Sequence, residues 1–150
     1  MSAFPDFLYR LTPRDEQVTP LEIVSNRLYG AAIASVTASS GVYIVPTGKV
    51  LVLSSFWVQT IAGAAQTALH SSVIIQPNNS LGNAAEIWGG GISGASAAGS
   101  TTTQGNSPSE IYLPQGCALY ASASFSAGAA ANTCNFSFTG VLIPRGNFAV

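Results

Sequence analysis

Charged residues are scarce in this sequence of 150 residues. Only 7% of the positions are Asp, Glu, Lys or Arg, against about 25% in an average soluble domain. The formal net charge is −1, so the chain lacks the basic surface that nucleic acid or an anionic membrane attracts. We therefore expect neither among its partners. The composition also argues against a helical protein, because exposed helix faces are normally filled with charged residues.

Residues that catalyse reactions or bind metal ions are equally few. His70 is the only histidine, and no acid lies near it in the sequence to complete a Ser-His-Asp arrangement. Cys117 and Cys134 do not have the spacing of a zinc site. The sequence therefore predicts no metal, no cofactor and no enzymatic activity, with His70 at the surface or in an interface.

Long hydrophobic runs are also missing, although 47% of the residues are hydrophobic. No stretch reaches the roughly 18 apolar residues of a membrane-spanning helix. The first six residues lack the basic start and apolar stretch of a secretory signal.

The charges that are present divide the chain into two parts. Seven of the eleven charged residues lie within positions 1–27, together with Pro5, Pro13 and Pro20. Prolines interrupt helices and strand ladders, so we predict an extended N-terminal arm over 1–27 and one domain over 28–150. The apolar residues of the arm suit contact with its own body or with a neighbouring subunit, and both alternatives stay open.

From Leu28 onward the pattern is typical of an all-β protein. Two strand entries, Val45-Pro46-Thr47-Gly48 and Leu113-Pro114-Gln115-Gly116, share one form, in which Pro fixes φ and Gly permits the turn. We predict an antiparallel eight-stranded jelly-roll sandwich. The expected strands are 28–37, 41–45, 48–60, 67–76, 83–88, 109–114, 116–126 and 132–143.

The last two expected strands alternate apolar and polar residues. A hairpin turn between them would pair Ala123 with Cys134 and would place both apolar sets on one face. Cys117 would then lie opposite Gly140, so we predict two buried free thiols, with a disulfide as the alternative.

Residues 49–58 are apolar on both faces of the expected strand. One face of such a strand normally meets water, so a second cover is expected, either the arm or another subunit. A surface with so little charge also repels its own copies only weakly. We therefore predict a homo-oligomer, either a trimer or a dimer.

The segment 89–108 has one large apolar residue and matches G-x-G-x-x-G at 89–94. A dinucleotide site would need a helix after the last glycine, and the small residues that follow have no apolar stripe. We therefore predict an exposed, mobile loop.

Two further groups of residues have a functional interpretation. Glu86 and Glu110 could form the carboxylate pair of a hydrolase, although rim carboxylates paired with Lys49 or Arg145 are favoured. The aromatic residues suit a sugar-binding face, a core or a subunit contact. Trp88 and Tyr112 are the predicted surface or ligand contacts; the full set is Trp57, Trp88, Tyr43, Tyr112 and Tyr120.

The body resembles small bacteriophage virion proteins with a jelly-roll domain, in particular capsid decoration or cement proteins. The resemblance covers about residues 28–150. It is carried by the strand count, the two strand entries, the loops of small residues and the ending 138–148. Tail-fibre tips and trimeric jelly rolls of the tumour-necrosis-factor and C1q type have similar strand entries.

The resemblance implies a non-enzymatic homo-oligomer that is made in the host cytoplasm and located on the outer capsid surface of the virion. Its partner would be the major capsid protein, and its function would be to bind and stabilise the shell. The alternative is a receptor- or glycan-binding tip domain of a phage tail or head fibre. The predicted capsid or subunit contacts of the arm are Phe4, Phe7, Tyr9, Arg10, Arg14, Leu21 and Arg27.

Overall fold

The computed structural model describes residues 22–77, 83–99, 101–106 and 111–147. Nine strands precede the short 3-10 helix η3 at Arg145–Asn147. Within these residues no helix has the length and hydropathy to cross a membrane. The strands are β1 (Glu22–Leu28), β2 (Ile33–Ser39), β3 (Tyr43–Ile44), β4 (Lys49–Ile61), β5 (Gln66–Gln76), β6 (Ala85–Ser96), β7 (Thr101–Asn106), β8 (Ile111–Pro114) and β9 (Ala118–Pro144).

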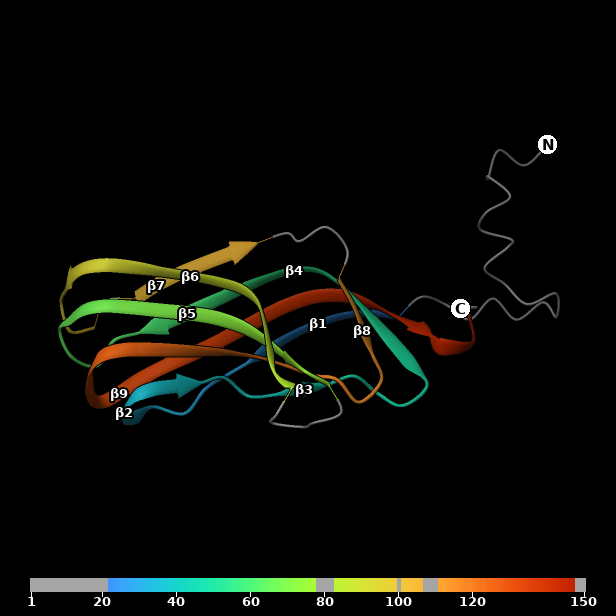
Figure 1. The fold of residues 1–150 in the computed structure, drawn as a ribbon, viewed down its shortest axis with the longest axis horizontal. Coiled ribbons are helices and arrows are strands. Elements are labelled where there is room, and N and C mark those ends of the chain that lie inside the picture. The colour runs from blue at the N-terminus through green and yellow to red at the C-terminus, as the bar shows by residue number, and fades with distance from the viewer. Residues whose placement is uncertain (1–21, 78–82, 100, 107–110, 148–150) are drawn as a thin grey trace.

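The strands form two antiparallel sheets that share β9 (Figure 1). In sheet A, residues 133–144 of β9 pair with β1 and β4, and β4 also pairs with β7 and β8. In sheet B, residues 118–125 of β9 pair with β5, residues 118–119 with β3, and residues within 122–132 with β2; β5 also pairs with β6. The predicted fold class, an all-β antiparallel sandwich of the jelly-roll type, is confirmed.

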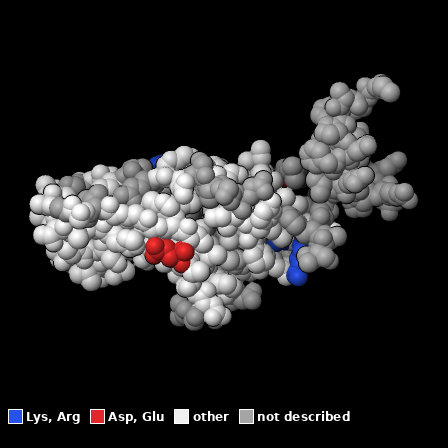
Figure 2. All heavy atoms as spheres, turned by 45° about the horizontal axis from the view of Figure 1, so that its top comes forward, with Lys and Arg blue, Asp and Glu red and all other residues white. Residues whose placement is uncertain are grey.

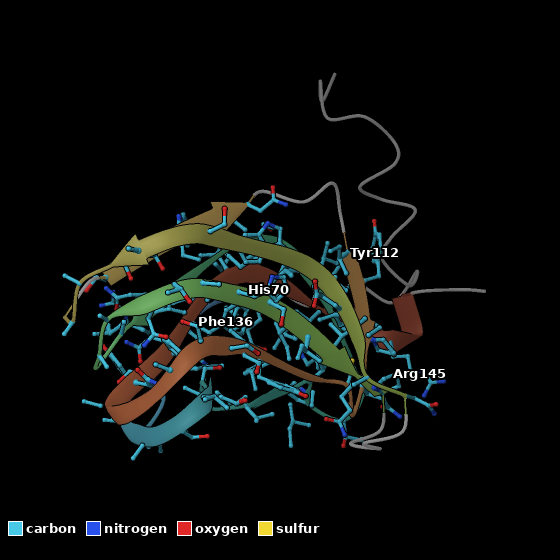
Figure 3. The ribbon with its side chains drawn as sticks, turned by 60° about the vertical axis from the view of Figure 1, so that its left-hand side comes forward. His70, Tyr112, Phe136 and Arg145 are labelled. Carbon is cyan, nitrogen blue, oxygen red and sulfur yellow. The ribbon has the colours of Figure 1, made fainter. Side chains whose placement is uncertain are left out.

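The hydrophobic core lies between the two sheets because alternate side chains of each strand point inward. Phe136 is fully buried and lies between the sheets in Figure 3. Its ring stacks on Phe138 with centroids 5.7 Å apart and lies 6.2 Å from the ring of Phe56. Two rings of sheet B meet this cluster edge-on: Trp88 of β6 lies 5.8 Å from Phe56, and Tyr43 of β3 lies 4.9 Å from Phe138, between ring centroids. Each buried aromatic side chain contributes about 2–3 kcal/mol of hydrophobic stabilisation, so these contacts hold sheet A against sheet B.

The predicted hairpin between the last two strands is wrong in its pairing. Ala123 pairs with Ser71 of β5, whereas Cys134 pairs with Thr60 of β4. The two halves of β9 therefore belong to opposite sheets. The apolar side chains of both halves still face one core, as the alternation of apolar and polar residues predicted. Cys117 and Cys134 are both buried and free, as predicted.

Two buried amides hold the crossover between the halves of β9. Asn132 has no exposed surface; it accepts the Gly63 N–H at 2.8 Å and donates to the carbonyls of Ser35 at 2.8 Å and Ala127 at 3.2 Å. The Gln66 side chain accepts the Ala127 N–H at 2.8 Å and donates to the Ala127 carbonyl at 3.2 Å. These bonds satisfy polar groups that burial would otherwise leave unpaired.

The loop predicted at 89–108 is wrong over most of its described length. β6 continues through Ser96 and pairs with β5, and β7 pairs with β4. Small side chains do not oppose backbone pairing, and glycine even assists it here. A Cβ atom on Gly91 would lie 2.5 Å from the Leu69 carbonyl oxygen. After Gly94 the chain continues as a strand, so the helix that a dinucleotide site requires is not there.

The end of the predicted arm belongs to the body of the protein. Residues 22–28 form β1 and pair with β9 from Leu142 to Phe136, so Arg27 is part of sheet A. The other predicted contact residues of the arm lie outside the described residues: Phe4, Phe7, Tyr9, Arg10, Arg14 and Leu21.

Candidate ligand-binding face

A bulge in β4 decides which of its side chains point outward. The register shifts between Leu53 and Ser55. Leu53 faces the core before the shift, and Phe56 and Val58 face it afterwards. Trp57 consequently points away from the core, with 47% of its surface exposed. The two-sided apolar character of this strand thus results from a change of parity within it.

The strands beside β4 place small residues on both sides of Trp57. Trp57 lies opposite Gly105 of β7 on one side and Ser137 of β9 on the other. A Cβ atom on Gly105 would lie 2.5 Å from Cδ1 of Trp57 and 2.7 Å from Nε1. The Cδ1–Nε1 edge of the indole therefore occupies the space where any residue other than glycine would have its Cβ atom.

A hollow of about 460 Å³ adjoins this ring on the outer face of sheet A. Its size is within the range of small-molecule sites. Apart from the indole, the lining is polar and comes from three neighbouring strands. We call this surface the ligand face; it consists of Ser25, Asn26, Arg27, Trp57, Gln59, Asn135 and Ser137.

Two side-chain amides on the ligand face are fixed by hydrogen bonds. Asn135 Nδ2 donates to Gln59 Oε1 at 3.1 Å, and Asn135 Oδ1 accepts the Gly30 N–H at 3.1 Å. An amide nitrogen has two hydrogens and an amide oxygen has two lone pairs. Both amides therefore keep donors and acceptors that a ligand can use.

Arg27 is the cationic group of the ligand face. It lies in one row with Ser137 and Trp57, and its guanidinium lies 5.8 Å from the centroid of the exposed Tyr29 ring. This cation–π contact gives the flexible side chain a preferred position. The other residues that line the hollow are uncharged. Charge is also sparse on the face drawn in Figure 2, where nearly all described side chains are neutral.

The two aromatic residues predicted as ligand contacts lie elsewhere. Trp88 is half-buried, and its ring meets Phe56 edge-to-face with centroids 5.8 Å apart, so it packs against the core. Tyr112 is 49% exposed and lies on β8, near the end of the molecule that carries Arg145 (Figure 3). Trp57 was in the aromatic set but could not be singled out, because the sequence does not reveal the bulge.

Tyr112 belongs to an apolar row across sheet A. Ile23 pairs with Val141, Val141 with Val52, and Val52 with Tyr112. Ile23 is 80% exposed. We call these four residues the apolar row.

Sheet B brings together His70 and Glu86, which lie 16 positions apart in the sequence. His70 Nε2 lies 3.6 Å from Glu86 Oε2, and both side chains are about half exposed. A Cβ atom on Gly89 would lie 2.1 Å from Glu86 Oε1, so this glycine makes room for the pair. Glu110 lies outside the described residues. Among the residues that the structure describes, no three His, Cys, Asp or Glu side chains gather around a common point.

The chain was compared with known protein families and structures. No family model matches, and no curated protein is similar in sequence. One similar solved structure is the carbohydrate-binding module TmCBM61 in complex with beta-1,4-galactotriose, with 9% identity and a TM-score of 0.30 over 85% of this chain and 90% of that chain. A similarity at this TM-score does not identify a ligand for this chain.

Proposed function

We propose that this protein binds glycans on the ligand face of sheet A. The observation that carries the proposal is the Trp57 indole, exposed and lying against Gly105 beside two fixed amides. A pyranose ring has an apolar face of C–H groups and a rim of hydroxyls. The indole suits the apolar face, and the amides of Gln59 and Asn135 suit the hydroxyls.

The position of the site on a packed sheet supports this function. Phe56 and Val58 anchor the backbone on both sides of Trp57, and Phe136 and Phe138 do the same around Ser137. Residues on such strands hold their positions better than residues on loops, so little ordering accompanies binding. Glycan binding is in line with the alternative function predicted from the sequence, a receptor- or glycan-binding tip domain of a phage tail or head fibre.

The test compares two exposed aromatic residues of sheet A. The full chain is screened on a glycan array, and the affinity for the best oligosaccharide is measured by titration calorimetry. Trp57→Ala should raise Kd roughly thirtyfold, which corresponds to about 2 kcal/mol for a residue at the centre of a contact. Tyr112→Ala is the matched control, because its exposed fraction is almost the same, and should change Kd less than twofold. No binding to any glycan, or equal effects of both substitutions, would contradict the proposal.

A structural role in a phage virion is the second candidate, and the apolar row favours it. Exposed contiguous apolar residues are typical of surfaces that a partner covers, and Ile23 is the most exposed of them. Light scattering on the full chain should give a closed dimer or trimer, and Ile23→Ser should shift it toward monomer. A monomeric wild-type protein would remove the support that the apolar row gives to this role.

A further inference from the structure

The charge balance around the ligand face identifies a class of glycan. The described residues contain two carboxylate side chains, and both have partners away from Arg27. Glu22 lies 3.6 Å from Lys49 Nζ, and Glu86 lies 3.6 Å from His70 on sheet B. Within the described part of the chain, Arg27 thus borders the hollow without a carboxylate within salt-bridge distance.

We infer that the ligand face binds an acidic glycan, and that Arg27 binds the carboxylate of a uronic acid residue while Trp57 contacts a sugar ring. This inference rests on the proposed function and adds the charge of the ligand to it. A guanidinium presents paired N–H donors in a plane, which matches the two oxygens of a carboxylate.

The geometry allows Arg27 and Trp57 to contact different parts of one ligand. Arg27 and Trp57 lie in the same row, separated only by Ser137, whose small side chain leaves the space above the sheet open. The Tyr29 ring supports the guanidinium from one side. A glycan whose carboxylate binds Arg27 can therefore extend across the hollow and place a sugar ring at the indole of Trp57.

The experiment uses oligogalacturonate and its fully methyl-esterified form as probes. The two ligands share one sugar backbone, and esterification removes the negative charge of each carboxylate while it adds a methyl group. The full-length protein should bind the acid form at least about tenfold more tightly than the ester, as one charge-assisted hydrogen bond would supply. Added NaCl should weaken binding of the acid form and leave binding of the ester unchanged.

Substitutions separate this inference from the proposed function. Arg27→Gln should raise Kd for the acid form to the value for the ester without changing the ester value. Arg27→Lys should fall between them, because lysine keeps the charge and loses the paired donors. Arg145→Gln, which removes an exposed cation outside the hollow, is the control and should change neither value. Trp57→Ala should weaken both ligands.

The outcomes are distinguishable. Equal affinity for acid and ester, or an unchanged acid affinity in Arg27→Gln, would overturn the inference and leave glycan binding intact. Binding only to neutral glycans of an array, with neither uronate form bound, would also overturn it. No binding to any glycan would overturn the proposed function as well.

Discussion

Asn132→Ala should destabilise the fold by about 3 kcal/mol. The side chain is fully buried and makes three hydrogen bonds, to Gly63, Ser35 and Ala127. A net contribution of about 1 kcal/mol per bond gives this value. The Ala127 carbonyl keeps a hydrogen bond from Gln66 in the variant, whereas the Gly63 N–H and the Ser35 carbonyl lose this side-chain partner. For a chain of 150 residues the melting temperature should fall by about 6–12 °C.

Urea unfolding followed by circular dichroism measures this change directly. Thr133→Ala is the matched control, because its hydroxyl donates to the Ala131 carbonyl in an exposed position. We expect it to alter the free energy of unfolding by less than about 0.5 kcal/mol. A loss below about 1 kcal/mol in Asn132→Ala would refute the idea that this amide holds the crossover between the two halves of β9.

Three further predictions concern the glycine beside Trp57 and the two buried cysteines. Gly105→Ala should displace the indole of Trp57 and weaken glycan binding in calorimetry, whereas Gly128→Ala, whose added Cβ has ordinary contacts at 3.6 Å, should not. Ellman's reagent should leave both buried cysteines unmodified in the native protein and react with both in urea; rapid native reaction would contradict their burial. Burial raises the pKa of Cys134 from 9.0 to about 12, so between these pH values the unfolded chain releases a proton that the folded protein retains. The free energy of unfolding should therefore fall as pH rises through that window, by about 1.4 kcal/mol per pH unit from this thiol, and urea unfolding of Cys134→Ala should show a shallower fall.

The fold class could be predicted because alternation and turn residues report local geometry. Cys134, Phe136 and Phe138 all face the core, as their spacing predicted. The partner strand could not be predicted in the same way. A strand that crosses from sheet B to sheet A at residues 126–132 has the same alternation as a hairpin, since both halves face one core. The buried amide of Asn132 was the available signal for the crossover, because a polar residue at an inward position needs fixed partners.

The ligand face was harder to predict, for one physical reason. Trp57 follows Phe56 and precedes Val58, so a strand of constant parity gives no indication of which ring faces outward. The bulge between Leu53 and Ser55 resolves the ambiguity only in three dimensions. Gly105 lay in a segment expected to be a loop, so its role beside the indole could not be predicted either.

An NMR titration with the bound oligosaccharide tests the central claim most directly, because the chain contains two tryptophans in different environments. The account predicts that the indole N–H signal of Trp57 and the side-chain amide signals of Gln59 and Asn135 shift with ligand concentration. The indole N–H signal of Trp88, which packs against the core, should stay in place. Shifts confined to Trp88 or to the residues of sheet B, with Trp57 unchanged, would contradict a glycan site on the outer face of sheet A.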